Sequence, residues 1–473
     1  METFTIKWKK TTEESLYEQL YNHIKTEIVS GRLRFGTRLP SKKKLIQNLN
    51  ISQTTVETAY EQLLAEGYIE SVPRKGYFVS AKEEFLHRNL PQTDVTLKVS
   101  PEKTQHYDYD FYPGLIDTSM FPFKQWRSLY RETICDENQD LLLLGRSIGE
   151  FSLREEIRKY LYQSRGVICS AEQIIVGAGI EHLLPQLVSL LGEKAVYGIE
   201  NPGYPLTKHV LSSQKRKSVF VEVDSEGADV RNIENSVISV MYVTPSHQFP
   251  LGSIMSANRR AILLNWAYKR NDRYIIEDDY DSEFRYYGRT IPSLHSLGEG
   301  KKVIYLSTFS KSLMPSLRIG YMVLPKQLMK RYQREFSHYA SCVPRIDQSV
   351  LAKFMRKGSF DKHLNRMRTV YRKKLETVVK ALEPYEDEIS ISGEKAGLHI
   401  LLTFPEEKNE NRLIKAAQKA QIRVCGLNNF FHKGTDEKFA GIVLGFAGMN
   451  EEQLSTGLEK LLKIWFKREK KRV

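Results

Sequence analysis

The segment 307–321 constrains this chain most, because it places a lysine and an arginine just beyond a hydrophobic run. The run Val303-Ile304-Tyr305-Leu306 has the composition of a buried strand, and Lys311 and Arg318 follow it. A lysine amine can form a Schiff base with an aldehyde, and a guanidinium can hold a phosphate through two charge-assisted hydrogen bonds. The two residues together indicate a site for pyridoxal phosphate, an aldehyde that carries a phosphate.

Four other apolar runs end in side chains that suit the same cofactor. Asp278 can face the pyridine nitrogen and keep it protonated, and Tyr280 can hydrogen-bond the ring hydroxyl oxygen. Tyr204 can stack on the ring, although any one of these residues alone could be a packed turn residue. The runs and the residues that follow them are 174–176 with Gly177, Ala178 and Gly179, 196–199 with Tyr204, 240–243 with His247, and 273–277 with Asp278 and Tyr280.

These runs predict an open α/β fold whose sheet is mostly parallel. Ligands of such sheets bind beyond the carboxyl ends of the strands, where side chains from different strands meet. Ala178 and Gly179 open a helix, and the free backbone N–H groups of a helix start suit an anion. We therefore expect the five strand ends to form one cofactor site.

The first 80 residues predict a winged helix-turn-helix. Leu16, Leu20, Ile24 and Ile28 recur every fourth residue, which is typical of an amphipathic helix that ends near Gly31. Two serines have the chemistry of helix caps: Ser41 begins a short helix to about residue 48, and Ser52 begins a third helix to about residue 66. The runs 67–72 and 77–79 then read as a hairpin, whose tip carries Arg74, Lys75 and Gly76.

This module predicts contact with double-stranded DNA. The second helix of a helix-turn-helix presents its first turn to the major groove, so Gln53, Thr54 and Thr55 are candidates for reading bases. The hairpin tip is placed to touch phosphate or the minor groove. Further candidates for sequence-independent contacts are Arg38, Ser41, Lys42 and Lys43. The formal net charge of +14 fits a protein that binds a polyanion.

The quoted residues resemble a known family. Residues from about Asp110 to Trp465 resemble a fold-type I aminotransferase. The strings Thr244-Pro-Ser-His-Gln-Phe-Pro and Ile276-Glu-Asp-Asp-Tyr-Asp-Ser-Glu-Phe are typical of the MocR type of GntR regulators. The resemblance implies a winged helix over 1–80 and an aminotransferase-like domain over 110–473, which has a mostly parallel sheet and a smaller C-terminal α+β domain. Residues 81–109 lack periodicity and predict a linker.

The resemblance also implies residue roles and an assembly. Lys311 would be the Schiff-base lysine, with Asp278 at the pyridine nitrogen, Tyr280 at the ring oxygen and Tyr204 stacked on the ring. The phosphate would be held by Arg318, Ser310 and the N–H groups of Ala178 and Gly179, and His247 would lie close to the ring. Family members form head-to-tail homodimers, so an operator with two half-sites is expected.

The chain departs from the family pattern at positions that bear on the ligand. Leu206, Asn429 and Val443 stand where arginines grip a substrate carboxylate in relatives or in many aminotransferases, and Arg146, Arg423 and Lys433 are replacement candidates. Gln53 replaces an arginine that usually opens the recognition helix, which favours adenine over guanine. Three functions stay open: a regulator that senses an amine, a regulator that senses pyridoxal phosphate itself, and an aminotransferase with an accessory DNA-binding domain.

Composition excludes several other classes. No run is long and apolar enough to span a bilayer, and the first residues do not begin a signal peptide. The four cysteines lie far apart in the sequence, with neither metal-type nor disulfide-type spacing: Cys135, Cys169, Cys342 and Cys425. We therefore expect a cytoplasmic protein without a metal site.

Overall fold

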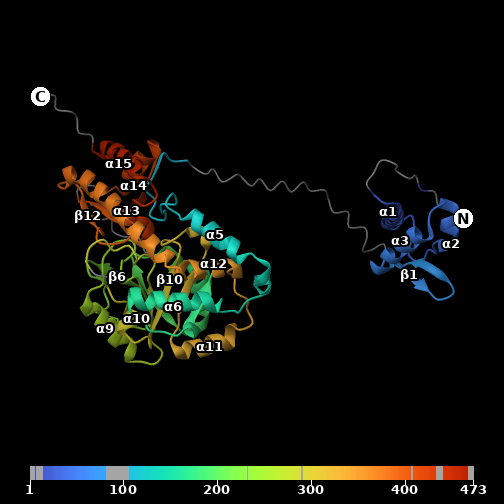
Figure 1. Cartoon of the computed structure of the whole chain (residues 1–473), viewed down its shortest axis with the longest axis horizontal. Helices are drawn as coiled ribbons and strands as arrows, with labels where there is room; N and C mark the ends of the chain where they lie inside the picture. Colours follow the sequence, from blue (N-terminus) through green and yellow to red (C-terminus); the bar gives the residue numbers. More distant parts are fainter. Residues whose placement is uncertain are drawn as a thin grey trace. The chain divides into compact units, whose positions relative to one another are not determined.

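The computed structural model describes residues 6, 14–80, 106–231, 233–288, 291–405, 409–432 and 440–466. The chain divides into two compact units, Met1–Thr104 and Gln105–Val473, and each unit is described here by itself (Figure 1). Most of the expected linker, residues 81–105, lies outside the described residues. Within the described ranges, no helix combines the length and the apolar character needed to cross a membrane.

The first unit confirms the predicted winged helix-turn-helix. Three helices, α1 (Leu16–Val29), α2 (Lys42–Leu49) and α3 (Gln53–Ala65), precede the antiparallel strands β1 (Ile69–Val72) and β2 (Gly76–Val79). The buried positions of α1 are Leu20, Tyr21, Ile24 and Ile28. Three of the four positions predicted from the sequence are therefore buried, whereas Leu16, the first residue of the helix, is exposed. They pack with residues of α2, α3 and both strands in one small core.

The turn between α2 and α3 is built from local hydrogen bonds. Asn50 adopts the left-handed conformation, with φ of 52°, which ends α2. The Ser52 hydroxyl then accepts a hydrogen bond from the Thr55 N–H at 3.2 Å, so it caps α3 as expected. The Tyr60 hydroxyl donates to the Pro40 carbonyl at 2.8 Å and ties α3 to the start of α2.

The second unit is centred on an eight-stranded sheet in the order β4-β11-β10-β9-β8-β5-β6-β7. The pairs from β10 through β9, β8 and β5 to β6 are parallel, whereas β11 and β7 pair antiparallel with their neighbours. The strands are β4 (Ile174–Gly177), β5 (Val196–Asn201), β6 (Lys217–Asp224), β7 (Gly227–Ala228), β8 (Val240–Val243), β9 (Tyr274–Asp278), β10 (Val303–Thr308) and β11 (Gly320–Val323). The predicted mostly parallel sheet is confirmed.

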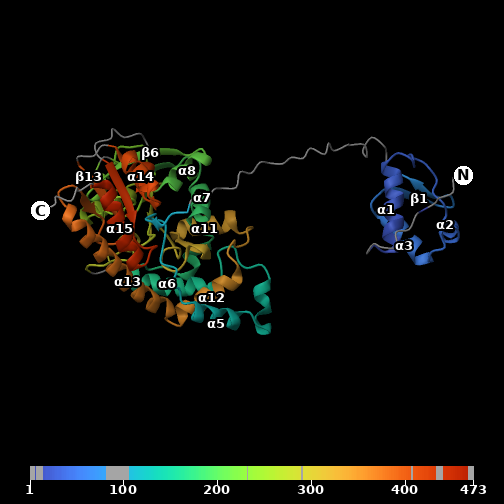
Figure 2. The ribbon, with the colours of Figure 1, turned by 90° about the horizontal axis from the view of Figure 1, so that it is seen from above.

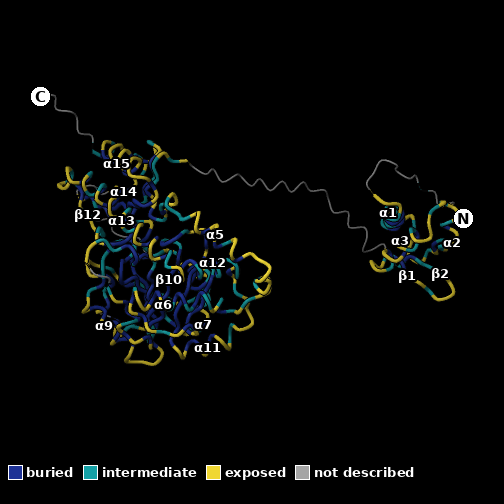
Figure 3. Tube along the Cα trace, in the orientation of Figure 1, coloured by how far each residue is buried: buried dark blue, intermediate teal, exposed yellow. Residues whose placement is uncertain are grey.

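Helices cover both faces of this sheet. In Figure 3 the buried trace gathers in the interior of this unit, and the exposed stretches lie at its edge. Along β10, Ile304 and Leu306 pack in one core with Leu183 and Leu187, whereas Tyr305 belongs to a second core on the other face. The helices are α5 (Phe123–Thr133), α6 (Phe151–Arg165), α7 (Ile180–Leu191), α8 (Pro205–Ser213), α9 (Ala257–Tyr268), α10 (Leu294–Leu297), α11 (Lys326–Phe336), α12 (Arg345–Arg356) and α13 (Ser359–Leu382).

A smaller α+β part follows α13, and its helices α14 and α15 lie near α13 in Figure 2. Its antiparallel sheet has the order β12-β13-β16-β15. The elements are β12 (Ser390–Ser392), β13 (His399–Phe404), α14 (Glu410–Lys419), β15 (Cys425–Gly426), β16 (Ala440–Gly445) and α15 (Glu451–Trp465). The strand β3 (Tyr109–Asp110) pairs with β14 (Ile422–Arg423), so the start of the second unit is fastened to this part.

Candidate functional site

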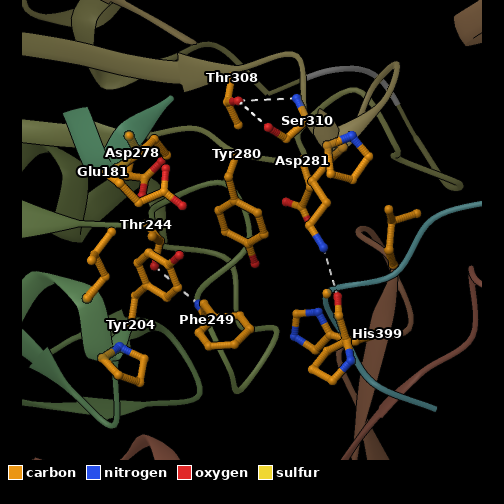
Figure 4. A pocket seen from close by; sticks show the side chains of 18 of the residues that line it. Glu181, Tyr204, Thr244, Phe249, Asp278, Tyr280, Asp281, Thr308, Ser310 and His399 are labelled. Carbon is orange, nitrogen blue, oxygen red and sulfur yellow. Dashed lines mark hydrogen bonds between the residues drawn. The ribbon is translucent and has the colours of Figure 1, made fainter. Parts of the chain in front are cut away.

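A cavity of about 670 Å³ opens in the second unit, where the strand ends of the large sheet meet. Each of the five strand ends singled out from the sequence contributes a lining residue. These residues are Ile180 and Glu181 after β4, Tyr204 after β5, Thr244 after β8, Asp278 and Tyr280 at the end of β9, and Thr308, Ser310, Lys311 and Arg318 at and after β10. Figure 4 shows labelled members of this set facing a common space.

Lys311 lies on the cavity wall with its amine held by a single backbone contact. Its Nζ donates to the Pro113 carbonyl at 2.8 Å, from the segment that precedes α5. Burial among protein atoms lowers the pKa of Lys311 to about 8, and the nearby Asp281 carboxylate opposes this effect. About a tenth of the amine is therefore neutral at pH 7, far more than for an ordinary lysine, and the neutral form is the one that a nucleophilic lysine requires.

Asp278 lines the cavity, and one of its carboxylate oxygens receives no hydrogen bond in the described structure. Its Oδ2 accepts a short hydrogen bond from the Tyr242 hydroxyl on β8, while its Oδ1 is buried without a partner. Burial raises the pKa of Asp278 to about 7, and the Tyr242 hydrogen bond counteracts part of that rise. A buried carboxylate oxygen without a donor is costly, so this geometry fits a ligand that brings a positively charged N–H.

Tyr280 and His247 belong to one hydrogen-bonded group. The Tyr280 hydroxyl donates to the His247 carbonyl at 3.1 Å, and His247 Nδ1 donates to Asp281 Oδ2 at 2.9 Å. Asp281 and His399 line the cavity. His247 is not among the lining residues, and it reaches the site through its hydrogen bond to Asp281. The group His247, Asp281 and His399 also has ligand atoms within 4.8 Å of one another, a metal-type spacing that the cysteine pattern did not suggest.

The anion end of the cavity is built from Arg318, Ser310 and the start of α7. Gly179 has φ of 84°, and a Cβ there would lie 2.8 Å from the Arg318 Nη2, so only glycine lets the guanidinium approach this closely. Arg318 Nη2 donates to Glu181 at 2.6 Å and contacts the Ala178 carbonyl at 3.4 Å. The Ser310 hydroxyl lies 2.8 Å from that of Thr308. These groups fit a phosphate, which would compete with Glu181 for the guanidinium.

Aromatic side chains form another wall. The Tyr204 ring lies edge-on to Phe249 with centroids 5.9 Å apart, and Phe249 lies edge-on to Phe430 at 4.9 Å. All three residues line the cavity. Because aromatic faces stack on heteroaromatic rings, this wall fits a planar ligand.

Sequence reasoning missed Asp281, Tyr242, Glu181 and Phe249 as members of this site. Asp281 lies three residues after Asp278 in the same string, and Tyr242 lies within a strand whose end had been selected, so adjacency was the available signal. Each of the two has a hydrogen-bond partner that is distant in sequence: Asp281 accepts from His247, and Tyr242 donates to Asp278. That pairing depends on the order of the strands in the sheet.

In the first unit, the base-reading candidates lie at the start of α3. Gln53 and Thr54 are exposed and Thr55 is half-buried, and both threonine hydroxyls lie within 2.9 Å of the Ser52 hydroxyl. Gln53 Nε2 donates to Glu57 at 3.1 Å, and Lys42 pairs with the same carboxylate at 3.7 Å. The remaining candidates are exposed, apart from the half-buried Gly76: Arg38, Ser41, Lys43, Arg74 and Lys75.

Comparison with known proteins assigns both units to families. Residues 16–79 match the family of bacterial regulatory proteins called gntR, and residues 115–461 match aminotransferase class I and II. The HTH-type transcriptional regulator YdeL of Bacillus subtilis is 42% identical over 96% of this chain and 98% of its own length. The probable rhizopine catabolism regulatory protein MocR of Rhizobium meliloti is 32% identical over 94% of this chain and 93% of its own length.

A further relative and a solved structure agree with this assignment. The pyridoxine biosynthesis regulator PdxR of Corynebacterium glutamicum is 30% identical over 93% of this chain and 94% of its own length. The crystal structure of an archaeal alanine:glyoxylate aminotransferase is similar with a TM-score of 0.70 and 25% identity, over 78% of this chain and 93% of that chain. The chain therefore belongs to the MocR-type subfamily of the GntR family, DNA-binding transcriptional regulators in which a helix-turn-helix domain precedes an aminotransferase-like domain.

Proposed function

We propose that this regulator depends on pyridoxal phosphate, held by Lys311 through a Schiff base, and that it senses an amine or the cofactor itself. The proposal rests on one observation: the same cavity is lined by the Lys311 amine and by Asp278, which has a buried carboxylate oxygen without a donor. An aldehyde next to a protonated pyridine nitrogen supplies a partner to each of these groups.

The remaining residues would hold and orient the cofactor. Arg318, Ser310 and the backbone N–H of Ala178 would bind the phosphate at the start of α7. The Gly179 N–H, also expected to be a phosphate donor, donates instead to the Gly177 carbonyl at 2.8 Å, because the turn before α7 closes on itself. Tyr204 would stack on the ring, and Tyr280, fixed by the His247 carbonyl, would reach the ring oxygen. His247 would act on Asp281 rather than on the ring, because its Nδ1 proton is donated to that carboxylate.

The bound cofactor supplies an electrophilic carbon that a primary amine can attack and an electron-withdrawing ring. The protein's own contribution is to keep Lys311 sufficiently deprotonated and to keep Asp278 ready to accept a hydrogen bond. The same groups would serve a transaminating enzyme, so an aminotransferase with an accessory DNA-binding domain stays the second candidate. Leu206 lies in the cavity wall at a position where relatives have an arginine that grips a substrate carboxylate. Its presence weakens the aminotransferase candidate, because catalysis needs the substrate held in a reacting pose.

The DNA side of the proposal rests on the first unit. Gln53, Thr54 and Thr55 would read bases, whereas Arg74 and Lys75 at the exposed hairpin tip would contact mainly backbone. Arg38, Ser41, Lys42, Lys43 and Gly76 would add contacts that do not depend on sequence. We propose a head-to-tail homodimer that binds two half-sites of one operator.

Three measurements test the proposal. Lys311→Ala should abolish the absorbance band of the lysine–cofactor imine in the purified protein, and a band that persists would remove Lys311 from this role. Operator affinity should then be measured by fluorescence anisotropy for apo and cofactor-loaded protein, alongside an assay for keto-acid formation. Rapid turnover of an ordinary amino acid, with operator affinity indifferent to cofactor and amine, would support the enzyme instead.

A further inference from the structure

The lysine and the arginine of the cavity lining are both already engaged. Two lining residues are lysine or arginine, Lys311 and Arg318, among the residues that the structure describes. Arg318 is paired with Glu181 at 2.6 Å and is the proposed phosphate ligand, while Lys311 is the proposed Schiff-base residue. The acidic lining residues are Glu181, Asp278 and Asp281. The cavity thus offers no further lysine or arginine from its described lining to an incoming carboxylate.

Two of the three replacement candidates, Arg146 and Arg423, do not fill this gap. Arg423 pairs with Asp110 at 3.4 Å, and its guanidinium lies over the Tyr112 ring at 4.3 Å. Neither Arg423 nor the exposed Arg146 is among the described residues that line the cavity. Lys433 lies outside the described residues.

The positions where relatives carry arginines are neutral here. Leu206 lines the cavity, and Asn429 is an exposed residue next to Phe430 in η5 (Leu427–Phe430). Val443 is fully buried in β16, packed with Leu401, Leu427 and Phe430. The imidazole of His399 adds no charge, because burial and the neighbouring His247 and Lys311 hold its pKa well below the ordinary value.

We propose that the effector of this regulator is a primary amine that lacks a carboxylate and carries an apolar or aromatic substituent. This inference rests on the proposed function, since the amine is recognised at the cofactor site. Phe249, Phe430, Leu206 and Leu398 supply apolar lining for the substituent. A carboxylate placed among these four side chains would lose its water and gain no cationic partner from them, and an unpaired buried charge is strongly unfavourable.

Matched pairs of ligands test the class directly. Phenethylamine differs from L-phenylalanine, and butylamine from L-norvaline, only by the carboxylate. Calorimetric titration of the cofactor-loaded full-length protein should give each amine an affinity at least roughly tenfold higher than that of its amino acid, the size of one lost charged hydrogen bond. Each amine should also change operator affinity at a lower concentration than its amino acid.

An introduced arginine provides the converse test. Leu206→Arg, at a residue of the cavity lining, should raise the affinity for L-phenylalanine and so reduce the ratio of the phenethylamine affinity to the L-phenylalanine affinity. Asn265→Arg is the matched control, since Asn265 is an exposed residue of α9 outside the cavity lining and the change adds the same charge. The control should leave the ratio unchanged.

The outcomes separate this inference from the proposed function. Amino acids that bind as tightly as their matched amines would overturn the inference, while the imine band and its loss in Lys311→Ala would still support the cofactor role. An operator response to pyridoxal phosphate alone, with none of the four ligands binding, would likewise overturn the inference and leave the cofactor as effector. An imine band unaffected by Lys311→Ala would overturn both.

Discussion

Tyr242→Phe removes the hydrogen bond to the Asp278 carboxylate and keeps the packing around it. Tyr242 is 3% exposed, and its hydroxyl donates to Asp278 Oδ2. Phenylalanine keeps the ring in the core, so the change removes one hydrogen bond to a charged group and leaves little cavity. Such bonds contribute about 1.5–3 kcal/mol.

The loss should appear in cofactor affinity. Without the hydroxyl, the pKa of Asp278 rises further above its value of about 7, so the carboxyl is more often protonated near neutral pH and accepts less well from a pyridine N–H. We expect pyridoxal phosphate to bind roughly 10- to 150-fold more weakly, the equivalent of the lost hydrogen bond. Fluorescence titration of apo protein measures this affinity.

Tyr197→Phe is the matched control for that variant. Tyr197 is 1% exposed in β5, and its hydroxyl donates to the neutral Val188 carbonyl at 3.4 Å. The control should lower the free energy of unfolding by no more than about 1 kcal/mol and leave cofactor affinity unchanged. Equal cofactor affinity in Tyr242→Phe and the wild type would refute the assignment of Asp278 to the ring nitrogen.

Three further predictions concern DNA, the lysine and a buried acid. Gln53→Ala should weaken binding to the cognate operator by roughly 1–3 kcal/mol and to random DNA little, whereas Lys75→Ala should weaken both equally and flatten the salt dependence. Equal losses on both DNAs for Gln53→Ala would require another recognition residue. The rate of cofactor capture by apo protein should rise with pH up to about 8, where Lys311 loses its proton, and a flat profile in stopped-flow absorbance would contradict this. Burial raises the pKa of Glu200 from 4.5 to about 7, so the folded state binds its proton more tightly and stability from this group is lost as pH rises across that interval. Glu200→Gln should therefore gain stability relative to wild type by up to about 1.4 kcal/mol per pH unit between pH 4.5 and 7 in urea unfolding, and parallel pH profiles would count against it.

Local signals in the sequence were sufficient for the winged helix and for the five strand ends. The capping serines Ser41 and Ser52 and the stripe of α1 depend on neighbours within a few residues, so the winged helix was predictable in detail. Likewise Lys311, Asp278 and Tyr280 follow apolar runs, and parallel strands bring such ends to one edge.

The rest of the site depends on which strands are neighbours. The pairing of β8 with β9 brings Tyr242 to Asp278, and the contact between Glu181 and Arg318 joins residues 137 positions apart. The same limit applies to Glu57, whose pairing with Gln53 is local but whose pairing with Lys42 requires the packing of α2 on α3. Contacts of this kind engage side chains that the sequence alone predicts to be available for a ligand.

The separate cores of the two units bear on how a ligand can regulate DNA binding. The buried cluster of the winged helix contains only residues of the first unit, and the clusters around the cavity contain only residues of the second, within the described chain. The cavity and the recognition helix therefore belong to different cores. A ligand shifts an equilibrium only by its difference in affinity between two states. For the proposed dimer those states differ in how two intact winged helices are presented to two half-sites, so regulation should act on paired half-sites and spare the affinity for one half-site.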